Sequence, residues 1–91
     1  MVGAIDLAER IIRDQEAIIG PLAWSVALEV DGLTVEGKNH IVFSRSGALI
    51  LGGLVKKYER LFGPASREVC RDAVRTLLPR VPAGDVPEVL K

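Results

Sequence analysis

The sequence predicts an α+β fold that is predominantly α-helical: two helix–Gly-Pro–helix hairpins, linked by a two-stranded β-hairpin and followed by a short C-terminal helix. Apolar residues recur every three or four positions in the first and last parts of the chain, as they do on the buried face of a helix. A Gly-Pro pair interrupts each stretch, at 20–21 and at 63–64, and β-branched runs lie between the two stretches. With 91 residues, we expect one domain, 1–91.

The first helical hairpin begins near the N-terminus. Residues 4–19 place isoleucines and alanines on one helical face, with charged residues between them. Gly20 suits the left-handed position just past a helix end, and Pro21 suits the first turn of the next helix. Residues 21–30 are apolar on nearly every face, so we expect this second helix to be largely buried, with Trp24 as the largest single burial.

Residues 33–43 have the pattern of a β-hairpin. Two short runs of β-branched and aromatic residues, 33–35 and 40–43, flank a turn sequence, Glu-Gly-Lys-Asn, at 36–39. A lone two-stranded hairpin is only marginally stable in water. We therefore expect helices, or a strand from another chain, to cover it.

The third helix is expected over 46–62, with Ser44 or Ser46 as its N-cap. Gly52 and Gly53 lie inside it, and each costs about 1 kcal/mol relative to alanine in a helix interior. Such a pair indicates either a break or a close crossing by another helix. Apolar residues continue on both sides, which favours the close crossing.

The second Gly-Pro pair is followed by a fourth helix, expected over 64–78, which Pro79 and Pro82 end. Asp85 and Glu88 have the spacing of a capping box. They predict a short final helix.

The two Gly-Pro regions align when the chain is shifted by 43 positions, with 12–21 lying over 55–64. Apolar positions, one glutamate and Gly-Pro match. The units of such a repeat would be 4–30 and 47–78, linked by the β-hairpin. The matching stretch is short, so both true duplication and convergent corner chemistry explain it.

Charge is distributed unevenly, although the formal net charge is zero. Residues 1–37 carry seven acidic and two basic side chains, a net of −5, whereas residues 38–80 carry nine basic and three acidic ones, a net of +6. Two interpretations follow. The acidic half folds onto the basic half, or the asymmetry serves contacts with a partner.

Cysteine usage and hydropathy indicate a cytoplasmic protein. Cys70 is the single cysteine, so no internal disulfide forms. No run of about 18 apolar residues predicts a transmembrane helix. The first residues lack the basic and apolar regions of a secretory signal.

No pattern in the sequence points to catalysis, so we expect neither an enzyme nor a cofactor or metal. Metal sites need clusters of ligands, and here His40 and Cys70 each stand alone. Cys70 has an inward helical position, typical of a small buried hydrophobe. Glu9 and Glu16 lie beside arginines, as on a solvated face, and Gly52–Gly53 lacks the context of a phosphate loop.

The best-patterned polar feature is a row of basic residues on the fourth helix. Arg67, Arg71 and Arg75 lie four positions apart, on one face. Glu68 and Asp72 can offset the positive charges of Arg71 and Arg75 through i,i+3 contacts. Further basic side chains on the preceding helix can extend the row: Lys56, Lys57 and Arg60. The row is either a solvated, partly paired face or a contact site for phosphates or an acidic partner.

Our leading hypothesis is a small, non-catalytic protein-interaction or regulatory module that forms a homodimer or binds another protein. Candidate dimer or pocket contacts are the larger side chains of the helices and the β-hairpin: Trp24, Ile41, Phe43 and Tyr58. One alternative is nucleic-acid binding through the basic face of 56–80, which zero net charge and the lack of aromatics for stacking disfavour. Another is a carrier of apolar small ligands, with a pocket near Trp24.

Overall fold

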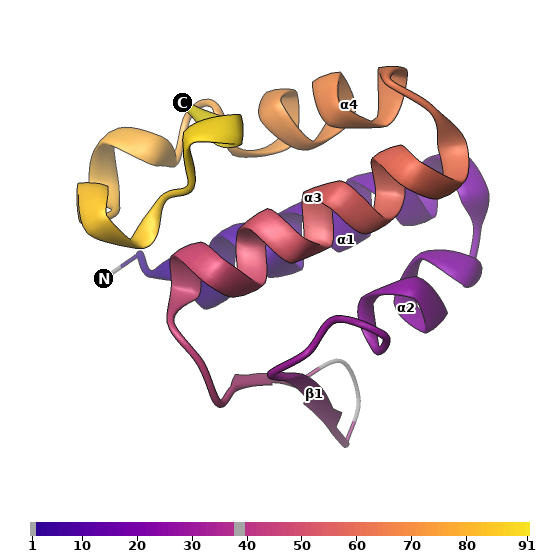
Figure 1. The fold of residues 1–91 in the computed structure, drawn as a ribbon, viewed down its shortest axis with the longest axis horizontal. Coiled ribbons are helices and arrows are strands. Elements are labelled where there is room, and N and C mark those ends of the chain that lie inside the picture. The colour runs from indigo at the N-terminus through magenta and orange to yellow at the C-terminus, as the bar shows by residue number, and fades with distance from the viewer. Residues whose placement is uncertain (1, 38–39) are drawn as a thin grey trace.

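The computed structural model describes residues 2–37 and 40–91 and has the predicted α+β, predominantly α architecture (Figure 1). The long helices α1 and α3 lie next to each other and run in the same direction. The short helices α2 and α4 return along opposite sides of this pair (Figure 1). The elements are α1 (Ala4–Ile19), α2 (Leu22–Ala27), β1 (Leu33–Glu36), β2 (His40–Phe43), α3 (Gly47–Phe62) and α4 (Ala65–Val74).

The bounds predicted for α1 are confirmed, but α2 is shorter and more exposed than predicted. After Ala27 the chain turns through 3₁₀-type bonds, such as that from Val30 N–H to the Ala27 carbonyl at 3.1 Å. Leu22 and Leu28 are 50% and 55% exposed. Trp24 is only partly buried, and Tyr58 is instead the largest fully buried side chain.

The β-hairpin pairs β1 with β2 in antiparallel register, from Leu33 opposite Phe43 to Glu36 opposite His40. Leu33 and Ile41 are buried in the core of the same chain. The hairpin therefore gains cover from its own helices. Positions 38 and 39 of the predicted turn lie outside the described residues.

Helix α3 is continuous through Gly52 and Gly53. Ser46 is its N-cap, because its hydroxyl accepts a hydrogen bond from Leu49 N–H at 3.3 Å. A Cβ at Gly53 would lie 3.2 Å from Val30, and one at Gly52 would lie 3.7 Å from Pro87. The neighbours of the glycine pair are thus the segment after α2 and the C-terminal segment, not a crossing helix as predicted.

The C-terminal region is less regular than predicted. Helix α4 ends at Val74, and three 3₁₀ turns replace the predicted final helix: Leu78–Arg80, Ala83–Asp85 and Glu88–Leu90. Proline at 79, 82 and 87 removes backbone donors and disfavours helical geometry in the preceding residue. The segment still closes the core, since Val81, Val86 and Leu90 are buried. None of the helices in the described part of the chain combines the length and apolar character needed to cross a bilayer.

The offset of 43 positions relates the two helical hairpins in structure as well as in sequence. Both long helices have 16 residues and end at a glycine with positive φ, 73° at Gly20 and 93° at Gly63. Each glycine N–H donates to the matching glutamate carbonyl, of Glu16 and Glu59, at 2.8 Å. Residues 43 positions apart are buried alike. Examples of pairs in which both residues are fully buried are Leu7/Ile50, Ile11/Leu54 and Ala27/Cys70.

Two buried hydrogen bonds cross between the hairpins at matching positions. Gln15 Nε2 donates to the Ser66 carbonyl at 3.2 Å, and Tyr58 Oη donates to the Ala23 carbonyl at 2.6 Å. With the offset of 43 positions, Gln15 corresponds to Tyr58 and Ala23 corresponds to Ser66. Each long helix is thus fastened to the short helix of the other hairpin, which places both Gly-Pro corners at the same end of the molecule (Figure 1).

The matching first residues of the long helices meet at the opposite end. A Cβ at Gly47 would lie 2.5 Å from the Cβ of Ala4, closer than real Cβ atoms approach. The close helix approach that the sequence suggested at 52–53 therefore occurs at Gly47.

We expect Gly47→Ala to destabilise the chain, because α1 and α3 must separate to admit the methyl group. Gly52→Ala is the matched control, since its methyl group meets only an ordinary contact. It should stabilise the helix by up to about 1 kcal/mol. Urea unfolding of the two variants checks this. If Gly47→Ala lowered the free energy of unfolding no more than Gly52→Ala does, the close approach of α1 and α3 would be contradicted.

We expect Tyr58→Phe to lower the free energy of unfolding by about 1 kcal/mol, the net contribution of a buried hydrogen bond. Thr34→Val is the control, because it removes an exposed side-chain bond to the Val42 carbonyl. Chemical denaturation should show a clear loss for the first variant and little change for the second. The reverse order would show that the Tyr58 bond does not hold the hairpins together.

Candidate functional site

The end of the molecule that carries both Gly-Pro corners has exposed apolar side chains. We call the set Ile18, Leu22, Leu61 and Phe62 the corner patch. Its members are 64%, 50%, 52% and 37% exposed. Both corners lie at the same end of the molecule (Figure 1), and the two buried hydrogen bonds between the hairpins lie near this end. A group of large apolar side chains at one end is typical of a contact surface.

Helical periodicity predicts that the apolar residues near the ends of the two long helices face inward, but Ile18, Leu61 and Phe62 are exposed. The last buried residue of α1 is Gln15 and that of α3 is Tyr58. The final turn of each long helix therefore extends beyond the core. The signal for this was present in the sequence, because an apolar pair precedes Gly-Pro in both repeats.

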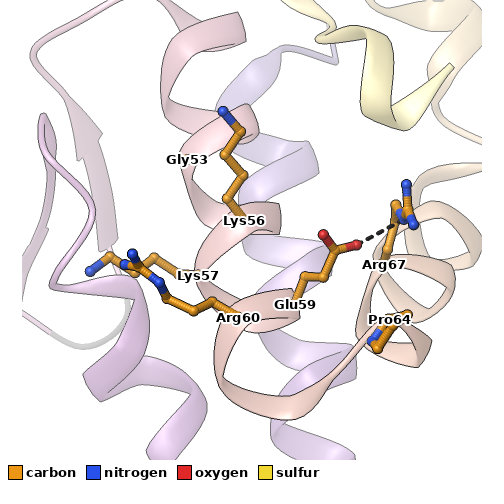
Figure 2. Close-up of a pocket in the computed structure, with 7 residues that line it drawn as sticks. All are labelled: Gly53, Lys56, Lys57, Glu59, Arg60, Pro64 and Arg67. Atoms are coloured by element: carbon orange, nitrogen blue, oxygen red, sulfur yellow. Dashed lines mark ion pairs between the residues drawn. The ribbon is translucent and has the colours of Figure 1, made fainter.

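A second surface feature is an open groove of about 600 Å³ on α3, which we call the basic groove. Figure 2 shows Lys57 and Arg60 pointing to the same side of α3, while Lys56 extends along the helix toward Gly53. Glu59 faces Arg67 of α4 across the groove (Figure 2). The lining residues are Gly53, Lys56, Lys57, Glu59, Arg60, Pro64 and Arg67.

Ion pairs offset only part of the charge in the basic groove. Arg67 Nε lies 2.9 Å from Glu59 Oε2, a buried oxygen that receives no well-aligned hydrogen bond. Lys57 Nζ lies 3.6 Å from Glu29 Oε1 on the segment after α2. Lys56 and Arg60 are exposed, and neither forms an ion pair with a described residue.

The arginine row predicted on α4 does not form one site. Arg67 lines the basic groove, whereas Arg71 and Arg75 line another groove near the C-terminus. The predicted i,i+3 pairs are present: Arg71 lies 3.5 Å from Glu68 and Arg75 lies 2.7 Å from Asp72. Arg71 also donates to the Lys91 carbonyl at 2.9 Å.

The acidic half of the chain packs against the basic half, but few ion pairs between described residues join the two. Among the described residues, the ion pairs that join residues 1–37 to residues 40–80 are Lys57–Glu29 and Arg45–Asp31, the latter at 2.9 Å. The other pairs are local to one half. Charge asymmetry therefore persists on the folded surface.

The other predicted contact residues lie mostly inside the molecule. Tyr58 and Ile41 are buried, so neither lies on a surface that a partner can reach. Phe43 is partly buried against the core. Trp24 is also partly buried, its Nε1 forms no hydrogen bond with any residue that the structure describes, and it does not line the basic groove.

His40 and Cys70, which were considered for chemistry, do not belong to a metal-binding cluster in the described part of the chain. No group of three or more His, Cys, Asp and Glu side chains among the described residues has the geometry of a metal site. His40 is exposed on β2. Cys70 is fully buried, and burial raises the pKa of its thiol to about 11, against the lowering effect of the hydrogen bond from Gln15. A thiol held protonated in this way is a poor nucleophile.

No protein-family model, curated protein or solved structure matches this chain.

The raised pKa of Cys70 predicts a loss of stability in alkali. The folded chain keeps the thiol proton up to about pH 11, whereas the unfolded thiol loses it near its ordinary pKa of 9.0. The stabilising contribution is therefore complete below pH 9 and disappears as the pH rises toward 11. Urea unfolding across this range should show a larger loss for the wild-type chain than for Cys70→Ala. Equal losses would contradict the assignment to Cys70.

Proposed function

We propose that this chain is a non-catalytic protein-interaction module that associates with a second copy of itself through the corner patch. The observation that carries the proposal is the exposure of four large apolar side chains at one end of a chain this small. Burying the exposed part of these side chains against a partner contributes about 25 cal/mol per Å² of apolar surface removed from water. The same patch on two copies makes a self-complementary twofold interface.

The charges beside the two corners support a second copy as the partner. Residues 14–25 carry two acidic side chains and no basic one, a net of −2. Residues 57–68 carry three basic and two acidic side chains, a net of +1. A twofold dimer that lays the first corner of one copy on the second corner of the other brings apolar side chains together and opposite charges near each other.

The experiment is the solution mass of the chain by light scattering, at low and at moderate salt. We expect a dimer that tolerates salt, because its centre is apolar. Ile18→Glu and Leu61→Glu place a charge in that centre, so each should weaken association at least about tenfold and give a monomer.

Leu49→Glu is the matched control. Leu49 is 67% exposed on the first turn of α3, at the end of that helix away from the corners. It should leave the dimer intact. A monomeric wild-type chain at high micromolar concentration, or equal dissociation by all three variants, would overturn the proposal.

A further inference from the structure

The basic groove holds positive charge that the chain itself does not offset. It has four cations and one carboxylate, Glu59. Lys57 and Arg67 have partners, which leaves Lys56 and Arg60 without an ion pair to any residue that the structure describes. These two lie one helical turn apart, on the accessible side of α3.

The corresponding surface of the first hairpin shows that the fold does not require this charge. An offset of 43 places Lys57 on Asp14, Arg60 on Ala17 and Arg67 on Trp24. The same offset places Lys56 on Arg13 and Gly53 on Arg10, and both arginines have acidic partners on their own helix. They pair locally, Arg10 with Asp14 at 4.0 Å and Arg13 with Glu9 at 2.8 Å. The two hairpins share their core but differ in charge at this surface.

We propose that the basic groove binds an acidic segment of another protein in extended conformation. Residues four apart on a helix are separated by about 6 Å along its axis. Side chains at alternate positions of an extended peptide lie about 6.6 Å apart on one face. Acidic residues at every second position therefore match the rise along α3 from position 56 to position 60. Lys56 extends toward Gly53 and Arg60 points to the Lys57 side of α3, so the peptide lies over α3 in the open groove, between the two cations (Figure 2).

The groove fits a protein carboxylate better than a nucleic acid. The chain has zero net charge, which gives no long-range attraction to a polyanion. Arg71 and Arg75, which would have to extend a phosphate-binding track, are paired with Glu68 and Asp72 and lie in a separate groove. Ion pairs with a few carboxylates need only Lys56 and Arg60.

The test is fluorescence anisotropy of a labelled peptide in which glutamate alternates with threonine. We expect weak binding that decreases with salt. Exposed ion pairs are individually weak, so Lys56→Gln with Arg60→Gln should weaken binding about tenfold. Arg71→Gln with Arg75→Gln removes the same charge outside the groove and should bind as the wild type does. Circular dichroism checks that both variants are folded.

Two further probes make the result decisive. A peptide with glutamine in place of every glutamate should not bind, and one with the glutamates in a single block should bind more weakly than the alternating peptide. Equal effects of the two double variants, or binding of the glutamine peptide, would overturn the proposal. Tighter binding of a single-stranded oligonucleotide of equal charge would also overturn it, in favour of nucleic acid. Retention of peptide binding by the Leu61→Glu variant separates this groove from self-association at the corner patch.

Discussion

Two buried hydrogen bonds between the helical hairpins determine how the rest of the molecule is arranged. The Gln15 amide and the Tyr58 hydroxyl are both buried, and each donates to a backbone carbonyl of the opposite short helix. A buried donor left without its partner costs about 1–3 kcal/mol. The hairpins therefore dock in a register that satisfies both donors. The parallel pair of α1 and α3, the shared end of the two corners and the position of the groove all follow from this docking.

Local signals were enough to predict α1, α3 and the β-hairpin. Helical periodicity sets the buried face of each long helix, and glycine with positive φ ends it in both repeats. The same signals were not enough for α2, because an apolar pattern does not show where a neighbouring helix stops covering it. In the C-terminal segment, the spacing of Asp85 and Glu88 suggested a capping box. Pro87 lies between them, and proline disfavours helical geometry in the residue before it, so that Val86 is extended at φ −110° and ψ 119°.

The surface could be predicted only in part, because it depends on which residues meet after folding. Lys56, Lys57, Arg60 and Arg67 were identified from charge alone and do line one groove. Their separation from Arg71 and Arg75 was not predictable from helical spacing, since α4 turns those side chains toward the C-terminal segment. The corner patch was missed because periodicity counts every apolar residue on a face as inward. Apolar residues in the last turn of a helix continue the apolar face, but no neighbouring element covers them.

The docking of the hairpins also affects how the chain folds. The hydrogen bonds of Gln15 and Tyr58 join residues 51 and 35 positions apart, and each hairpin completes the core of the other. Helical bundles fold quickly when their contacts are local in sequence, and proteins with distant contacts fold more slowly. In this chain the helices can form early, but the core cannot close until the first hairpin meets the second across the intervening β-hairpin. Its folding rate is therefore governed by the closure of a long loop, as in a β-sheet protein, although most of its residues are helical.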